Sequence, residues 1–296
     1  SNEREMTTIL TPFIPCSAKL PIIALFTGYF FPKYPGLAST SLYFFAIVVI
    51  VLSSIIMKKL VFKNTASTYI SELPEYKIPS LKYVVKEVFE KVLSFIKRAG
   101  SIILFCSIVI WFLLSFSFNM KYGVSIEESI LASIGKRISW VFTPMLGVNS
   151  WEATVSAIQG LVAKEQVVSS MAVISGLSTK IKEGGKIFSG SGAFSFFTVS
   201  SAYAFMVFNL FSAPCFGAIG AMRKELGSLK SLLKAVTFQT VIAWVLATCI
   251  YQIGSRIENG LFNITDGVFI SIIVIIIILM ARSIYGKTEC RCGNCY

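Results

Sequence analysis

The chain has 296 residues, of which 55% are hydrophobic and only 14% are charged, whereas an ordinary soluble domain carries about 25% charged residues. It contains no histidine, which excludes a Ser-His triad, a histidine general base and any histidine metal ligand. The net charge of +12 comes from Lys and Arg in short loops between apolar runs. This distribution follows the positive-inside rule of membrane proteins and favours a membrane protein over a nucleic-acid-binding protein.

Four long runs in the chain contain no Asp, Glu, Lys or Arg. They are residues 37–57, 100–119, 193–222 and 235–255. Because about 20 apolar residues cross a bilayer as a helix, runs of this length predict membrane-spanning helices. We therefore expect an all-α fold, a polytopic transmembrane helix bundle, with broken or re-entrant helices where proline or charge interrupts a run.

The first membrane block, residues 1–57, contains the proline-bracketed stretch Pro15-Cys16-Ser17-Ala18-Lys19-Leu20-Pro21. This stretch places a thiol, a hydroxyl and a cation between two prolines. The apolar residues 20–32 that follow are too few to cross a bilayer unless the stretch itself lies in the membrane. Because the chain opens on Ser1 rather than Met, we also expect it to be the downstream part of a longer protein.

Residues 58–99 form the longest polar stretch, which we interpret as a cytoplasmic loop and a helix. Ser80 suits an N-cap position, and apolar residues recur at helical spacing from Leu81 to Ile96 while Lys and Glu fill the other face. A basic amphipathic helix that leads into a span is typical of the membrane surface. A soluble helix packed on its own loops is the alternative.

The second membrane block, residues 100–283, includes an apolar segment, 152–176, with Lys164-Glu165 at its centre. Each charge within a membrane costs about 2.5–3.5 kcal/mol on insertion scales, so such residues normally face a bundle interior or a wet cavity. We predict that Glu165 lines a cation path and that Lys164 holds or gates its charge. A structural ion pair, or a helix end at the membrane interface, is the alternative.

The distribution of Lys and Arg orients the chain. If 152–176 re-enters the membrane without crossing it, one side holds 18 Lys and Arg and the other holds 8. If 152–176 crosses, the split becomes 15 against 11. The stronger asymmetry favours the re-entrant arrangement, because cytoplasmic loops carry an excess of Lys and Arg. Both ends of the chain, including the tail 284–296, are then predicted to be cytoplasmic.

A second proline-cysteine step, Pro214-Cys215, interrupts the run 193–222. Proline removes a backbone donor, and the carbonyls it frees can face an ion, as in the discontinuous helices of transporters. A thiolate beside them prefers borderline or soft metals to Na⁺, K⁺ or Mg²⁺. One buried cysteine is usually a small hydrophobe, but two such steps predict that Cys16 and Cys215 line a metal-ion path. The polar residues that support this path are Ser17, Lys19 and Lys164.

Three cysteines in the tail, Cys290, Cys292 and Cys295, form a C-x-C-x-x-C cluster. Thiols this close in sequence can reach one soft ion, so the cluster predicts transition-metal capture. Its predicted cytoplasmic location argues against disulfides. No phosphate loop of the G-x-x-x-x-G-K-[ST] kind occurs in the sequence. We therefore do not expect this chain to be an enzyme that hydrolyses a nucleotide.

Several collinear blocks resemble the C-terminal part of the membrane domain of the ferrous iron transport protein B (FeoB) family. The blocks are residues 7–21, Glu72-Leu73-Pro74 with Tyr76 and Pro79, residues 97–103 and 160–165, Ala213-Pro214-Cys215, and residues 223–228 and 251–254. The resemblance implies an Fe²⁺ permease in the cytoplasmic (inner) membrane of a prokaryote. It implies that Cys16 and Cys215 are path cysteines and that a gate motif ends in Lys164-Glu165. A G domain with GTP and Mg²⁺, and a first gate block, would lie upstream.

The resemblance also implies partners: the lipid bilayer, the upstream half of the transporter, small cytoplasmic accessory proteins of the same system, and further copies of the chain in a homo-oligomer. It implies no nucleic acid. We expect the two thiols to flank the cytoplasmic end of the path, with Glu165 deeper and the tail receiving Fe²⁺. Two alternatives stay open at this point: a transporter of nucleosides or other organic solutes, and a non-transporting scaffold whose helix 80–98 docks a partner.

Overall fold

The computed structural model describes residues 2–60, 80–117, 121, 128–162, 164, 167–175, 187–188 and 194–258. Every regular element within these ranges is a helix, so the predicted all-α fold is confirmed. The α-helices in chain order are α1 (Asn2–Leu10), α2 (Leu20–Phe30), α3 (Pro35–Leu60), α4 (Leu81–Ser115), α5 (Ile130–Leu146), α6 (Trp151–Val162), α7 (Val167–Ile174), α8 (Val199–Phe211), α9 (Phe216–Leu226) and α10 (Leu229–Glu258). Two short 3-10 helices, η1 (Thr11–Phe13) and η2 (Ser17–Lys19), lie between α1 and α2.

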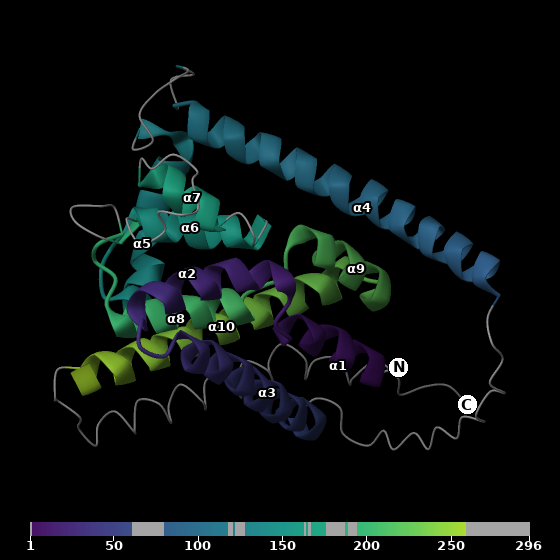
Figure 1. The fold of residues 1–296 in the computed structure, drawn as a ribbon, viewed down its shortest axis with the longest axis horizontal. Coiled ribbons are helices and arrows are strands. Elements are labelled where there is room, and N and C mark those ends of the chain that lie inside the picture. Colours follow the sequence, from purple (N-terminus) through teal and green to yellow (C-terminus); the bar gives the residue numbers. More distant parts are fainter. Residues whose placement is uncertain are drawn as a thin grey trace, which may run out of the picture.

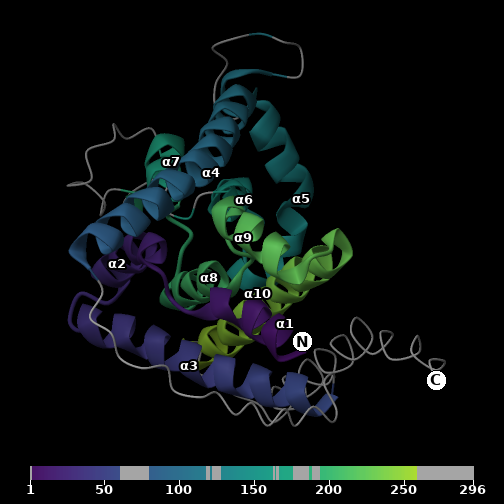
Figure 2. The ribbon, with the colours of Figure 1, turned by 90° about the vertical axis from the view of Figure 1, so that its right-hand side faces the viewer.

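Helix α8 lies at the centre of the bundle (Figures 1 and 2). Apart from Tyr203, its side chains from Ser200 to Phe211 are buried, and a helix that is apolar all round belongs in a core. Helices α2, α3, α5 and α10 lie against it. Phenylalanine rings from α2, α8 and the segments before α8 pack together: Phe26, Phe30, Phe188, Phe197 and Phe205.

Two broken helical segments lie next to each other in the bundle. The first runs from Arg4 to Phe30 through α1, η1, η2 and α2, and it is long and apolar enough to span a membrane. The second joins α8 to α9, which are bent by 41° at their break. Because α1 lies against α9 and α2 lies against α8, the two segments run antiparallel and bring their breaks together.

The first break lies within a candidate span. That span runs from Arg4 to Phe30, so Cys16 falls near its middle in sequence, and the location of the thiols at the cytoplasmic end of the path stays a prediction. Helix α1 and η1 are part of the core, with Ile9 and Phe13 fully buried. Gln239 of α10 also donates from Nε2 to the backbone oxygen of Ile9 over 2.7 Å, which ties the end of α1 into the bundle.

The remaining candidate spans follow the apolar runs of the sequence. Helix α3 and helix α10 contain the predicted spans 37–57 and 235–255, and both are long and apolar enough to cross a membrane. The run 193–222 is broken near Pro214, as predicted, into the bent pair of α8 and α9. The described helices therefore support a multi-pass membrane protein.

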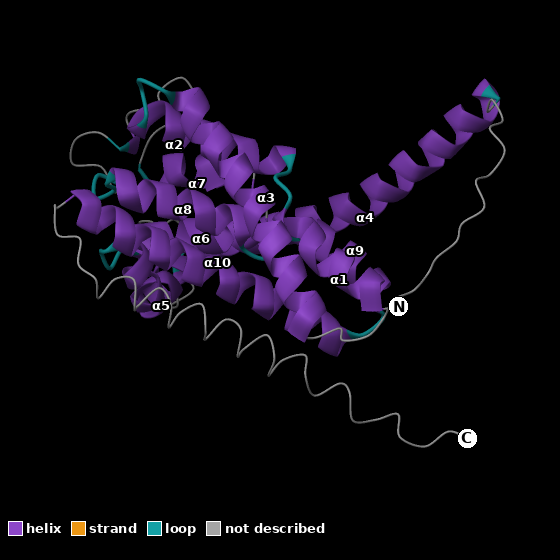
Figure 3. Ribbon diagram, turned by 90° about the horizontal axis from the view of Figure 1, so that it is seen from below, coloured by secondary structure: helices purple, strands orange, loops and turns teal. Residues whose placement is uncertain are grey.

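Helix α4 is one continuous helix of 35 residues. Ser80 occupies its N-cap position, as predicted, and Lys86–Glu90 and Lys91–Glu87 pairs lie on its polar face at 4.0 and 3.2 Å. The helix does not end near Gly100, so the amphipathic half lies in line with the apolar half and crosses the predicted boundary between residues 99 and 100. Its N-terminal end projects beyond the bundle (Figures 1 and 3).

Helices α6 and α7 cover the segment predicted to re-enter the membrane. With 12 residues, α6 is about 18 Å long, which is shorter than the hydrocarbon core of about 30 Å. Helix α7 has only 8 residues and packs against α6. These lengths are compatible with a re-entrant pair, and the sidedness of 152–176 stays a prediction.

Several predicted features lie outside the described residues. They are Glu165, the cysteine tail with Cys290, Cys292 and Cys295, and the block at Glu72-Leu73-Pro74. The predicted domain limits at residues 57, 99 and 283 also stay predictions.

Candidate functional site

Both proline-cysteine steps open onto one cavity of about 330 Å³. Cys16 comes from the break between η1 and η2, and Cys215 from the break between α8 and α9. Lys19 and Lys164 line the same cavity. The structure therefore brings together four of the residues singled out in the sequence, from three segments that are far apart along the chain.

Lys19 is almost completely buried, with 4% of its surface exposed. Its ammonium group donates to the backbone oxygens of Pro12 at 2.9 Å, Ile14 at 3.3 Å and Leu210 at 2.7 Å. The first two acceptors belong to the break between α1 and α2, and the third belongs to the last turn of α8. Lys19 thus ties the two broken segments to each other.

Lys164 is buried even more completely, with 2% of its surface exposed. Its ammonium group donates to the backbone oxygen of Asn209 at 2.8 Å, and to the backbone and side-chain oxygens of Ser212 at 3.1 and 3.3 Å. All three acceptors lie at the C-terminal end of α8. The residue reaches this end from the connection between α6 and α7.

The two lysines together neutralise the carbonyl end of the central helix. The last carbonyls of a helix have no partner within it and carry partial negative charge. We expected the carbonyls freed by Pro214 to face an ion, but those of Asn209, Leu210 and Ser212 accept from lysine ammonium groups. These carbonyls are therefore paired with lysine side chains.

The two thiols remain available on the cavity wall. Cys16 is exposed and Cys215 is partly exposed, and neither forms a disulfide. Each stands in the N-cap position of the following helix, η2 or α9, without a side-chain capping bond. Among the described residues, no group of three or more Cys, Asp or Glu is arranged to hold a metal ion. Both thiols therefore line one cavity, and in the described part of the chain no closed set of metal ligands surrounds them.

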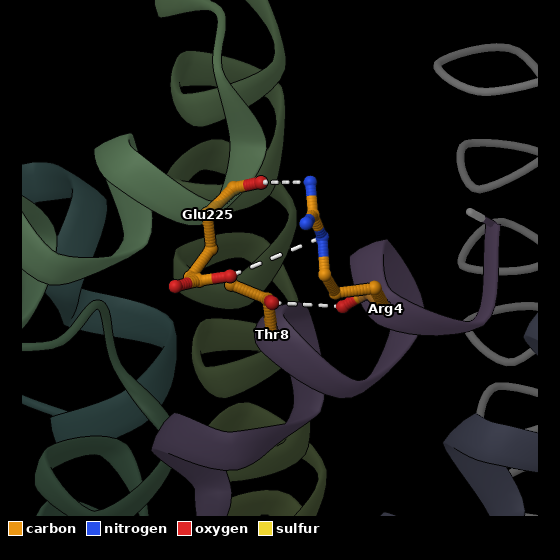
Figure 4. A network of polar contacts seen from close by, with 3 residues as sticks. All are labelled: Arg4, Thr8 and Glu225. Carbon is orange, nitrogen blue, oxygen red and sulfur yellow. Dashed lines mark hydrogen bonds and ion pairs between the residues drawn. The ribbon is translucent and has the colours of Figure 1, made fainter.

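Helix α9 supplies the wall opposite α1. Ala218, Ala221, Met222 and Glu225 of α9 line the cavity, and Thr8 of α1 faces them. Arg4 donates from Nη2 to the backbone oxygen of Glu225 at 3.3 Å, and its Nε lies 3.9 Å from the Glu225 carboxylate (Figure 4). This contact joins α1 to α9 at the outer end of the cavity.

Sequence reasoning missed this second wall. The signal was the helical spacing of Ala218, Met222 and Glu225, because residues three or four apart share one face of a helix. It could not identify α1 as the facing element, since that pairing depends on the antiparallel arrangement of the two breaks. Ser17, which was predicted to support the path, is exposed and is not among the cavity-lining residues.

A close helix contact positions the segment that carries Lys164. A methyl group at Gly160 of α6 would lie only 2.8 Å from Asn209 Oδ1 and 3.1 Å from a methyl carbon of Val167. The absence of a side chain lets α6 approach the end of α8. Asn209 is itself held by a bond of 3.0 Å from Nδ2 to the backbone oxygen of Phe205.

Two family models match the chain. Residues 39–91 match the model for the ferrous iron transport protein B C terminus, and residues 96–229 match the Gate model, described as nucleoside recognition. The second match covers α8, the break after it and α9, together with Lys164 and Cys215. No solved structure is significantly similar to the chain.

Curated relatives from bacteria and an archaeon carry the name Fe(2+) transporter FeoB. The protein of Staphylococcus aureus (strain MSSA476) is 39% identical over 260 residues, which are 86% of this chain and 37% of the relative. That of Methanocaldococcus jannaschii is 36% identical over the same shares, and that of Escherichia coli (strain K12) is 29% identical over 95% of this chain and 43% of the relative. The chain spans less than half the length of these relatives. By sequence, it belongs to the ferrous iron transport protein B family and corresponds to the C-terminal region of its members.

Proposed function

We propose that this chain forms part of the membrane path of a ferrous iron transporter and that Fe²⁺ passes the cavity between the two broken helices. The observation that carries the proposal is the meeting of Cys16 and Cys215 at one cavity. The names of the relatives agree with Fe²⁺ as the transported ion. The antiparallel broken helices agree with the way transporters build ion sites from discontinuous helices.

The chemistry of the cavity suits an ion in transit. Fe²⁺ is a borderline metal that accepts thiolate ligands, and each thiol that binds it releases one proton. Conduction requires binding that is favourable enough for an ion to enter and weak enough for it to leave. Two thiols, without a third Cys, Asp or Glu ligand among the described residues, meet this requirement better than a closed site would.

A nucleoside transporter is not favoured, although the Gate model is described as nucleoside recognition. A nucleoside needs polar groups that can pair with a base and a sugar. Here the Thr8 and Thr11 hydroxyls donate to their own helix, to the backbone oxygens of Arg4 and Thr7, both at 2.7 Å. The lysine ammonium groups likewise donate to backbone carbonyls, and the other side chains that line the cavity are mainly apolar or thiol groups. A non-transporting scaffold would have no use for two thiols at one cavity.

The remaining parts of the transport system belong to the same proposal. GTP and Mg²⁺ act in a G domain upstream of this region, as the family resemblance implies. Both ends of the chain face the cytoplasm of a prokaryote, so the cysteine tail receives Fe²⁺ on the inner side. Accessory proteins and further copies of the chain assemble around this region.

The proposal is tested by replacing the thiols one at a time. Cys16→Ser and Cys215→Ser variants of the complete gene product are expected to lose Fe²⁺ uptake by roughly tenfold or more in an iron-starved host, because a hydroxyl is a poor ligand for a borderline metal. Radioactive iron uptake measures the effect, with immunoblotting of the membrane fraction to normalise protein amount.

Cys249→Ser provides the matched control. Cys249 is a partly exposed free cysteine on α10 and does not line the cavity, so the same chemical change there should leave uptake unchanged. Normal uptake in both cavity variants would remove the thiols from the path. Uptake of a labelled nucleoside that is insensitive to Fe²⁺ would favour the competing transporter instead.

A further inference from the structure

Two buried lysine side chains line the cavity beside its thiols. The ammonium groups of Lys19 and Lys164 donate to neighbouring carbonyls of α8, those of Leu210 and Asn209. A site meant simply to attract cations would not contain two cations of its own. The arrangement therefore needs an explanation that goes beyond the thiols.

We propose that Lys19 and Lys164 determine ion specificity: their charges exclude hard cations from the cavity and admit only metal ions that can replace thiol protons. The inference rests on the proposed Fe²⁺ path and names the residues that set its selectivity. No metal bond to the lysines is involved, so they act through their charge alone.

The ammonium groups are held in place and cannot serve as movable ligands. An ammonium has three protons, and each of these lysines has three acceptors within 3.3 Å. Neither lysine forms an ion pair with a carboxylate in the described part of the chain, and Glu225 at the outer end of the cavity is engaged by Arg4. With their protons committed, the lysines offer no free donor to an anion.

Proton exchange explains how a metal ion can enter against these charges. When a divalent ion binds both thiols, two S–H bonds break, two metal–sulfur bonds form and two protons leave. The net charge of the cavity is then the same after binding as before. Mg²⁺ and Ca²⁺ do not bind thiolates well, so they displace no protons and their whole charge adds to that of the two lysines.

The repulsion therefore acts selectively. It opposes Mg²⁺ and Ca²⁺ in full, whereas for Fe²⁺ it is offset by the release of two protons when the thiols bind the ion. The same holds for other divalent ions of similar softness, such as Co²⁺ and Zn²⁺. Thiol ligation alone favours soft ions. The two ammonium charges also raise the electrostatic energy of every ion that enters the cavity without binding the thiols. Selectivity commonly combines such attraction with built-in repulsion.

The test removes the charge and retains a polar donor. In Lys19→Gln and Lys164→Gln variants the charge is gone, and the shorter amide keeps two N–H donors in place of the three of the ammonium group. The complete gene product is reconstituted in liposomes, and Fe²⁺ and Mg²⁺ influx are measured with trapped fluorescent indicators. The ratio of Fe²⁺ to Mg²⁺ influx is expected to fall roughly tenfold in each variant, because like-charge repulsion at this range is strong away from water.

Lys224→Gln is the matched control. Lys224 lies on α9 but is exposed, so the loss of its charge should leave the ratio unchanged. Variants that carry Fe²⁺ with the original ratio would overturn the inference and leave the proposed function standing. Unmutated protein that carries no Fe²⁺ would instead refute the proposed function itself.

A second measurement needs no lysine variant and covers the case in which the variants do not fold. Cys16 of the unmutated protein is treated with an anionic and with a cationic methanethiosulfonate, which form a mixed disulfide and release a sulfinate. The rates at Cys16 are read by mass spectrometry and divided by the rates with free mercaptoethanol. The anionic reagent is expected to react roughly tenfold faster on this scale. Equal rates, or a faster cationic reagent, would show that no positive field acts on the thiol.

Discussion

At the scale of single residues, the central helices depend on one very close contact. A methyl group added at Gly254 of α10 would lie 2.6 Å from Ser200 Oγ and 2.9 Å from Ser200 Cβ. The second atom is next to the backbone of α8 and cannot swing away. Gly254 therefore sets how closely α10 approaches the core helix on which both lysines converge.

Gly254→Ala is expected to destabilise the protein by about 1–3 kcal/mol, the usual cost of forcing extra atoms into a packed interface. The matched change is Gly100→Ala on α4, where an added methyl meets nothing within 4 Å and should stabilise the helix by about 0.5–1 kcal/mol. Scanning fluorimetry in detergent measures both melting temperatures. A Gly254→Ala protein that melts at or above the unmutated one would contradict this account of the α8–α10 contact.

Much of the cavity was recognisable residue by residue in the sequence. Cys16, Cys215, Lys19 and Lys164 stand out because thiols beside prolines and charges in apolar runs are unusual. Their partners were not recognisable, since Lys19 bonds to a carbonyl 191 positions away and Lys164 to one 45 positions away. Backbone carbonyls carry no sequence signature, so only the assembled bundle identifies them.

At the scale of elements, helix α8 begins with a reciprocal cap. The backbone N–H of Ser201 donates to Thr198 Oγ1 at 3.2 Å, and the backbone N–H of Thr198 donates to Ser201 Oγ at 2.8 Å. This capping box satisfies two donors at the start of a helix that is otherwise buried in apolar surroundings. The same helix thus has a side-chain cap at one end and two lysines at the other.

Thr198→Ala is expected to cost about 1 kcal/mol, the typical loss for an N-cap residue. Thr198→Ser keeps the hydroxyl and should restore most of the loss. Chemical denaturation in detergent, followed by tryptophan fluorescence, compares the two variants. Equal midpoints for alanine and serine would mean that the hydroxyl does not stabilise α8.

The elements themselves were largely predictable, because length and apolar content identify membrane helices. The breaks at Cys16 and Cys215 were also predictable from proline. The burial of α1 in the core was not, since α1 combines polar residues with Ile9 and Leu10, which only the contact with other helices buries. The continuity of α4 was missed for a related reason: the change from polar to apolar at Gly100 alters the surroundings of a helix without ending it.

At the scale of the whole molecule, helix α3 presents two unlike faces. Leu42, Ala46 and Val49 are buried against the bundle, whereas Ile47 and Val51 expose 57% and 51% of their surface. An exposed apolar face on a helix long enough to span a membrane fits contact with lipid tails. Lipid tails then cover the apolar side chains of α3 that the bundle leaves exposed.

Ile47→Asp tests this assignment. A carboxylate near the middle of a lipid-facing helix costs about 2.5–3.5 kcal/mol on insertion scales, so the yield of folded protein in the membrane should fall several-fold. Leu37→Asp is the control, because Leu37 is equally apolar and 67% exposed but lies at the start of α3, near the membrane interface. Fluorescence-detected size exclusion reads both. Equal yields would place the outer face of α3 in contact with something other than lipid.

The unbroken course of α4 gives the molecule a lever. The helix packs against α9, which forms one wall of the cavity, while its other end projects beyond the bundle (Figure 3). The polar half, residues 81–99, is about 28 Å long, so a tilt of 10° about its base moves the free end by about 5 Å. A displacement of a few ångströms at the free end therefore corresponds to a rotation of only a few degrees where α4 meets α9. A stiff rod of this kind joins the space outside the bundle to the cavity wall without any intervening hinge.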